Sequence, residues 1–226
     1  MLRSSYISGI VSHIMRNEAP VTTQLLTYQP REGDIMPLTF PEFRPTLARF
    51  ATGVTVVATA FEDRFYGLTV NAFCSVSLEP PLVLISLENA SQTLSALRRS
   101  QVFSVNILTS AQQELSRRFA RKEAEVHKSF DDIPLHRGET GAPLFDEALA
   151  YIECQVAAEY PGGDHTLLLG QVVSLFYCDE EEMGEDAPQP LLYISSHYRS
   201  LASPERLNRR VEAPAGHNGV RARRPH

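Results

Sequence analysis

The sequence predicts a mainly β fold with flanking helices, built around a mostly antiparallel sheet that closes on itself. Six or seven short runs rich in β-branched and apolar residues are separated by turn-forming residues. Three stretches carry apolar residues at helical spacing, but they do not alternate regularly with the strands. Because a strand–helix–strand rhythm is missing, an antiparallel sheet is favoured over a parallel one.

The first half of the domain mixes strands and helices. Phe43, Leu47 and Phe50 recur at helical spacing and predict a helix over 41–51, ended by Gly53. A second helix is expected from an N-cap at Asn89 or Ser91 to about Ser100, and a third carries Ala111, Leu115 and Phe119. Apolar runs predict four strands, at Val54–Phe61, Phe65–Val70, Leu82–Leu87 and Val102–Leu108.

The second half is predicted to be mostly β. From residue 152, apolar positions alternate with positions such as Glu153, which predicts a strand with one buried and one solvated face, the buried side being Ile152, Cys154, Val156 and Ala158. The turn 161–164 leads back into a long strand, Thr166–Tyr177, where Gly170 predicts a bulge or a close neighbour. An acidic loop over 178–190 and a last short strand, Leu191–Ile194, complete the domain.

Length and charge define the organisation of the 226-residue chain. We expect a mobile N-terminal extension over 1–37, one domain over 38–203, and a disordered basic tail over 204–226 that carries six arginines. The net charge of −6 therefore leaves the body of the chain acidic. Because phosphate neutralisation requires clustered Lys and Arg, we expect no nucleic-acid partner.

Cysteine content and hydropathy restrict the cellular setting. Three widely spaced cysteines, Cys74, Cys154 and Cys178, argue against a disulfide framework and are expected to be small core residues in a cytoplasmic protein. No Cys or His cluster has the spacing of a metal site, so no metal is predicted. The apolar runs are far shorter than the ~20 residues that span a bilayer, so we expect no membrane insertion.

Two segments stand out as candidate binding regions. Gly67–Pro81 is dense in small and hydroxyl-bearing residues, and such a stretch can bring backbone N–H and C=O groups against a flat polar ligand. Gly162–Thr166 displays His165 at a hairpin tip, where it could contact a ligand. Taken from the residues alone, a Ser/Thr-rich strand edge and a simple glycine turn are the favoured explanation of these two segments.

The combination of motifs resembles the flavin reductase-like domain family, which has the FMN-binding type of antiparallel split β-barrel. The resemblance covers about 40–201 and rests on segments that occur in one order, namely Phe50–Val57, Gly67–Pro81, Asn89–Thr93, Phe103–Leu108, Gly162–Val172, Pro190–Tyr193 and Tyr198–Arg199. Members include the small reductase components of two-component flavin-dependent monooxygenases.

The resemblance implies a set of site residues. The stretch that wraps the flavin ring, largely through backbone groups, matches Thr69, Val70, Asn71, Ala72, Cys74, Ser75 and Ser77. The flavin phosphate would meet Asn89, Ser91 and Thr93 at a helix N-terminus, where the dipole favours an anion. His165 matches the catalytic position that faces the nicotinamide, and Tyr198 and Arg199 would close over that region. Two departures are Cys74, where Ser or Thr is common, and Lys128-Ser129 before Phe130, where members often carry Asp with Lys or Arg.

The implied function is that of an NAD(P)H-dependent flavin reductase, which passes a hydride from NADH or NADPH to FMN or FAD and supplies reduced flavin to a monooxygenase. The resemblance also implies a homodimer with flavin sites near its interface. Two alternatives stay open at this point. One is a flavin-binding protein or electron carrier without NAD(P)H turnover, and the other is an interaction module that acts through the two tails.

Overall fold

The computed structural model describes residues 40–121, 129–178 and 187–201. The predicted extension over 1–37, the tail over 204–226, Lys128 and most of the acidic loop therefore lie outside the described residues. The chain divides into two units, Met1–Glu42 and Phe43–His226. The strands and the binding segments all belong to the second unit.

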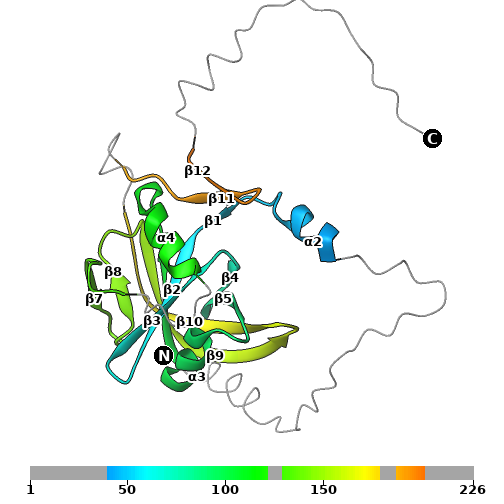
Figure 1. Ribbon diagram of the computed structural model, residues 1–226. Coiled ribbons are helices and arrows are strands. Elements are labelled where there is room, and N and C mark those ends of the chain that lie inside the picture. Colours follow the sequence, from blue (N-terminus) through cyan, green and yellow to red (C-terminus); the bar gives the residue numbers. More distant parts are fainter. Residues whose placement is uncertain (1–39, 122–128, 179–186, 202–226) are drawn as a thin grey trace, which may run out of the picture. The chain divides into compact units, whose positions relative to one another are not determined.

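The fold of the second unit is centred on a seven-stranded sheet with the order β3-β2-β6-β9-β10-β5-β4 (Figure 1). Every pairing between its strands is antiparallel, as predicted. The strands are β2 (Thr55–Phe61), β3 (Arg64–Val70), β4 (Phe73–Leu78), β5 (Pro81–Glu88), β6 (Val102–Ile107), β9 (Ala150–Gly162) and β10 (His165–Tyr177). Six of the seven were expected, and β4, which lies inside the hydroxyl-rich segment, was not.

The sheet is not closed by hydrogen bonds, and the expectation of a closed sheet was wrong in this respect. Strands β3 and β4 end the strand order on its two sides. They follow one another in sequence with only 71–72 between them, yet no ladder joins them among the described strands. The chain leaves β3 at this point and forms β4 against β5 instead, with Phe73 opposite Ile85. The result is the split that leaves the outer edge of β4 open.

Two smaller sheets complete the β structure. Strands β1 (Thr52–Gly53), β11 (Leu192–Ile194) and β12 (His197–Arg199) form a three-stranded sheet in the order β1-β11-β12. The predicted last strand is thus β11, in a sheet separate from the main one (Figure 1). Strands β7 (Leu135–Arg137) and β8 (Pro143–Phe145) form a short hairpin.

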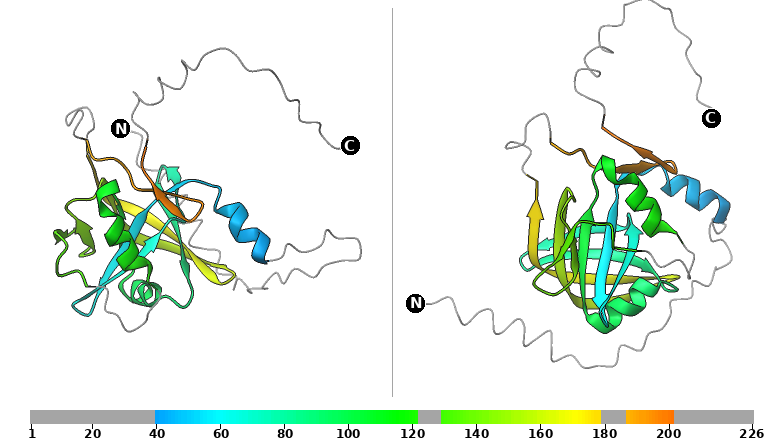
Figure 2. Two further views of the ribbon diagram at one scale, coloured as in Figure 1. Left: turned by 45° about the horizontal axis from the view of Figure 1, so that its top comes forward. Right: turned by 60° about the vertical axis from the view of Figure 1, so that its left-hand side comes forward.

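The described part of the chain contains three α-helices, as predicted. Helix α2 (Phe40–Leu47) is shorter than the expected 41–51, because the backbone turns at 48–50. Helix α3 (Gln92–Ser100) packs on β2 and β3, and α4 (Gln113–Ala120), which follows the short 3-10 helix η1 (Ser110–Gln112), packs on the same two strands. Figure 2 shows α3 at one end of the sheet and α4 beside its strands.

The core has two parts that these helices cover. Under α3, Leu94 and Leu97 pack with the inward side chains of β5 and β10, such as Leu87 and Leu168. Near α4, Phe119 packs in an aromatic cluster with Phe65, Phe130 and Phe145. Because an aromatic ring buries a large apolar area, this second cluster fixes α4 against the sheet.

Two sequence expectations about burial were wrong. Glu153 was expected on the solvated face of its strand, but it is fully buried. Its carboxylate accepts hydrogen bonds from the backbone N–H groups of Glu139 and Thr140 and from the Thr140 hydroxyl, which replace the lost water. Of the cysteines expected in the core, only Cys154 is buried, whereas Cys74 is exposed on β4 and Cys178 is half-buried at the end of β10.

Candidate functional site

The sheet register gathers the predicted binding segments around one end of β5. Strand β5 lies between β10 and β4. On one side Phe73 pairs with Ile85, and the Ser86 N–H donates to the Ala72 carbonyl (3.1 Å). On the other side the ladder ends with His165 opposite Glu88. The start of β4 and the β9–β10 tip therefore lie on either side of the second half of β5, which leads into α3. They are separated by about two strand spacings, roughly 10 Å, across the sheet and by about three residues, roughly 10 Å, along it.

The first wall of this candidate site is the segment 71–77. Asn71, Ala72, Cys74 and Ser75 are exposed, and Ser77 is half-buried. Because β4 is the last strand of the sheet, the backbone N–H and C=O groups on its outer edge have no strand partner among the described residues. Such an edge can hydrogen-bond a flat polar ligand through the main chain, as the sequence predicted.

The second wall is the N-terminus of α3. Ser91 is the N-cap, and its hydroxyl accepts a hydrogen bond from the Leu94 N–H (3.4 Å). An α-helix leaves its first N–H groups without intrahelical partners and carries a partial positive charge there, which suits a phosphate. Thr93, the second predicted phosphate contact, is buried with 4% of its surface exposed. Ser91 is therefore the hydroxyl of this pair that solvent reaches.

The third wall is the tip of the β9–β10 hairpin. The His165 side chain is 43% exposed, so it projects from the tip rather than into the core. Its Nδ1 lies 2.7 Å from Asp164 Oδ1, and because a carboxylate only accepts, Nδ1 is the donor. In the neutral imidazole this leaves Nε2 as an acceptor for a ligand. Gly163, at φ +77°, forms the left-handed turn that glycine tolerates best.

Strand β12 joins the site through a chain of hydroxyl groups. Tyr198 Oη lies 2.9 Å from Ser116 Oγ on α4. The Thr69 hydroxyl in turn donates to the Ser116 carbonyl (2.6 Å). Tyr198 therefore lies beside the end of β3, directly before the segment 71–77. The Arg117 guanidinium carbon lies 5.6 Å from the centre of the Tyr198 ring. The next residue after Tyr198 on β12, Arg199, is exposed.

The structure thus brings the predicted residues together but divides them into two kinds. Cys74, Ser75, Ser91, His165 and Arg199 are wholly or partly open to solvent. The polar groups of others are engaged within the protein, or the residue is buried: Thr69 uses its hydroxyl on α4, Val70 is buried in the core, and Asn89, although exposed, uses both ends of its amide within the protein. Ser116, which links Thr69 to Tyr198, was not foreseen, since an isolated serine in a helix carries no sequence signal.

Among the described residues, no group of three or more His, Cys, Asp or Glu side chains is placed to hold a metal ion. None of the helices in the described ranges has the length and apolar character needed to cross a bilayer.

Comparison with known proteins gives one consistent family. The family model for the flavin reductase like domain matches residues 47–202. The reductase subunit HsaB of a flavin-dependent monooxygenase from Mycobacterium tuberculosis is 38% identical over 164 residues, which cover 73% of this chain and 83% of that protein. An NADH-dependent flavin reductase from a Rhodococcus species is 37% identical over 173 residues, covering 75% and 91%.

Solved structures agree with these relatives. The flavin reductase PheA2 in its native state superposes with a TM-score of 0.64 and 36% identity, and the match covers 74% of this chain and all of that one. The Streptomyces globisporus NADH:FAD oxidoreductase SgcE6, in complex with NAD and FAD fragments, gives a TM-score of 0.65 at 34% identity and covers 74% and 98%.

Proposed function

The chain belongs to the flavin reductase-like domain family, and we propose that it is an NAD(P)H-dependent flavin reductase. The observation that carries this proposal is the sheet register, which gathers an open strand edge, a helix N-terminus and a histidine-bearing tip around one end of β5. A flat ring with a phosphate tail, approached by a second nucleotide, needs these three kinds of contact.

The residues present fit FMN or FAD. The outer edge of β4 offers backbone donors and acceptors to the ring, and so do the exposed residues before and within it, Asn71, Ala72, Cys74 and Ser75. Val70 and Ser77 lie at the two ends of this wall. Ser91 and the first N–H groups of α3 offer donors to the phosphate, backed by the buried Thr93. When bound, the flavin would accept a hydride from NADH or NADPH at its N5 atom, so the protein supplies position rather than the redox group.

His165 would position the nicotinamide. Its Nε2, left as an acceptor by the bond from Nδ1 to Asp164, is suited to the carboxamide N–H of the nucleotide. Alignment of two rings at near-contact distance is the main demand of hydride transfer, and a single well-placed hydrogen bond serves that demand. Tyr198, held by Ser116, and Arg199 would close this side of the site.

The partner of the product would be a monooxygenase component, because the HsaB relative is named as a reductase subunit of such a system. Reduced flavin can diffuse, so no stable complex with that partner is needed. The domain would extend over 38–203, with 1–37 and 204–226 as dispensable extensions. The three free cysteines suit the reducing cytoplasm.

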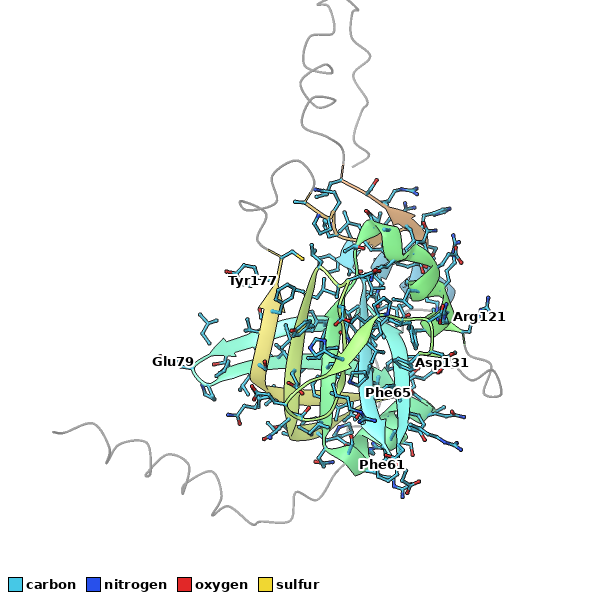
Figure 3. All side chains as sticks on the ribbon, turned by 90° about the vertical axis from the view of Figure 1, so that its left-hand side faces the viewer. Phe61, Phe65, Glu79, Arg121, Asp131 and Tyr177 are labelled. Atoms are coloured by element: carbon cyan, nitrogen blue, oxygen red, sulfur yellow. The ribbon has the colours of Figure 1, made fainter. Side chains whose placement is uncertain are left out.

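A homodimer would cover an exposed apolar surface at one end of the sheet. Val76 and Leu78 on β4 are 51% and 90% exposed, and Leu175 and Tyr177 on β10 are 59% and 64% exposed. Figure 3 shows Tyr177 and Glu79, at the β4–β5 turn, on the same side of the molecule, opposite Arg121 and Asp131. Large apolar side chains exposed to this extent are typical of an interaction site.

Two measurements test these proposals. Mixing the protein with FMN or FAD and NADH or NADPH should consume the nicotinamide absorbance, whereas a flavin carrier would bind flavin without turnover. In size-exclusion chromatography the wild type should elute as a dimer and Leu175→Lys as a monomer, with Arg121→Glu on the opposite side as the control. Lack of turnover with both nucleotides would contradict the reductase, and a monomeric wild type would contradict the dimer.

A further inference from the structure

Asn89, which lies outside the hairpin, makes three hydrogen bonds to the β9–β10 tip. The ladder between β5 and β10 ends at Glu88 and His165, and Asn89 is the next residue along the chain. Its backbone N–H donates to the Asp164 carbonyl (3.0 Å) and its Nδ2 donates to the Gly163 carbonyl (3.0 Å). Its Oδ1 accepts from the Thr166 hydroxyl (2.7 Å). Asn89 thus binds the tip on both sides of His165.

The direction of the Asn89 amide is fixed by its partners. A backbone carbonyl can only accept, so the group that faces Gly163 must be the NH₂. The carbonyl oxygen then faces Thr166, whose hydroxyl donates to it. Only a side chain with a donor and an acceptor at this spacing satisfies both partners.

A second line of contacts holds the same tip from α3. Arg98 Nη2 donates to the Thr166 hydroxyl (3.2 Å), and its Nε donates to Glu159 Oε1 (2.9 Å) on β9. The Thr166 hydroxyl therefore accepts from Arg98 while it donates to Asn89. This links both strands of the hairpin to α3. Thr166 is 3% exposed, so its hydroxyl is shielded from water, whereas the contact between Arg98 and Glu159 is open to solvent.

A hairpin tip needs such a link if it is to present a side chain in one place. Exposed loop tips are the most mobile part of a fold, and a displacement of about 1 Å at a reacting group can reduce a rate about a hundredfold. His165 itself has only the exposed Asp164 beside it on the tip. The backbone of His165 pairs with Glu88 and Gly162 at the ends of two ladders, and Asn89, Thr166 and Arg98 add the side-chain contacts that hold the tip beyond these ladder ends.

We propose that Asn89 is a positioning residue for His165: it fixes the β9–β10 tip, and it acts on flavin reduction through His165 rather than by contact with the flavin phosphate. This inference rests on the proposed reductase function and changes the role that the family resemblance implied for Asn89. Thr166 and Arg98 belong to the same positioning network.

The kinetic test compares variants of the full-length protein by stopped-flow reduction of bound flavin over a range of NADH concentrations. Asn89→Asp keeps the size of the side chain but removes the donor to Gly163. It should lower the limiting reduction rate by about ten- to a hundredfold, the effect of one hydrogen bond that matters in the transition state. Flavin affinity, measured by fluorescence, should stay unchanged.

The most decisive measurement is whether the losses in reduction rate caused by the substitutions at Asn89 and His165 add together. If Asn89 acts through His165, the double variant Asn89→Asp/His165→Ala should be no slower than His165→Ala alone. Additive losses, or a loss of flavin affinity with an unchanged reduction rate, would overturn the proposal and place Asn89 on the flavin.

Hydrogen exchange gives a readout that needs no turnover. In Asn89→Asp, and more weakly in Thr166→Val, the amides of 162–166 should exchange about tenfold faster, because local opening becomes easier. Arg98→Ala should also speed this exchange. Arg99→Ala is the matched control, because Arg99 is the next residue on α3 but pairs with Glu62 in the turn between β2 and β3. Unchanged exchange in Asn89→Asp would overturn the proposal even where the reductase activity holds. A wild type without turnover would contradict the reductase, and the exchange data would still decide whether Asn89 holds the tip.

Discussion

The β9–β10 tip and the β4 edge lie on opposite sides of β5 and reach the site in different ways. The tip is fixed by side chains: Asn89, Thr166 and Arg98 hold the backbone around His165. The edge offers its main chain, while side chains such as Cys74 and Ser75 are exposed on it. A site built this way should be sensitive to single substitutions on one side and tolerant of them on the other.

The largest expected effect is in the middle of β10, at Gly170. A Cβ at Gly170 would lie 2.4 Å from Phe103 Cζ and 3.0 Å from Cys154 Cβ, and both of these side chains are fully buried. Gly170→Ala should therefore lower the free energy of unfolding by about 2–3 kcal/mol, as overpacked cores do. Gly53→Ala is the control, because nothing lies within 4 Å of its Cβ. Denaturant unfolding that gave equal stability for the two variants would contradict the close approach.

The second largest effect is expected at His165, where a substitution should change the reduction rate, assigned to the tip, without changing the flavin affinity, assigned to the β4 edge. His165→Ala should slow flavin reduction by about ten- to a hundredfold, or roughly 1–3 kcal/mol, because the nicotinamide loses one positioning hydrogen bond. Flavin affinity should hardly change, since the flavin is expected on the β4 side. Single-turnover reduction measures this step free of product release. If the variant reduces flavin at the wild-type rate, His165 has no role in the mechanism. If the variant loses flavin, His165 contacts the flavin itself rather than the nicotinamide.

A smaller effect is expected at the start of α3, where side chain and main chain act together. Ser91→Ala removes the hydroxyl that caps the helix and leaves the backbone N–H groups in place. Flavin affinity should fall by about 1 kcal/mol, the net worth of a typical hydrogen bond. Ser95→Ala, an exposed serine one turn later on the same helix, is the control. A fluorescence titration in which both variants bind FMN and FAD like the wild type would exclude this segment from the site.

The contrast between tip and edge also explains what the sequence could predict of the fold. Strands with apolar side chains on a buried face, such as β2 and β10, can be predicted from their amino-acid composition. Strand β4 does not, because its residues Phe73–Leu78 are mostly exposed and rich in hydroxyl groups. The closed sheet was predicted for the same reason: without β4 as an edge strand, nothing in the sequence indicates where the sheet opens.

The site residues follow the same rule. His165 at a tip and Ser91 at a helix start could be proposed from local sequence, since glycines and cap residues mark such positions. The roles of Asn89 and Glu153 could not, because their partners lie far away along the chain. Asn89 binds 163–166, and Glu153 is buried by hydrogen bonds from the loop at 139–140. Polar side chains of this kind look solvated in a sequence and are recognised only when the register is known.

Cys154 on β9 and Cys74 on the β4 edge differ in their thiol chemistry, and they give the smallest effect. Burial raises the pKa of the Cys154 thiol to about 12, so this thiol stays neutral and should resist a thiol reagent such as dithionitrobenzoate in the folded protein. Because the unfolded thiol ionises near its ordinary pKa of 9.0 and the buried thiol does not, the contribution of Cys154 to the free energy of unfolding is fully present below pH 9.0 and is lost as the pH rises toward 12. Cys74, exposed on β4, should react readily.

Cys74→Ser tests whether the edge binds through its main chain. The substitution introduces the hydroxyl that the family resemblance implies at this position and leaves the β4 backbone unchanged. If the flavin contacts backbone groups here, its affinity should shift by less than about 0.5 kcal/mol, the usual scale for an exposed position. Bound flavin should meanwhile slow the labelling of Cys74 in the wild type, since a ligand on this edge shields the thiol. An affinity change of more than about tenfold, or roughly 1.4 kcal/mol, would show that the side chain itself contacts the flavin, and labelling that flavin does not slow would place the ligand away from β4.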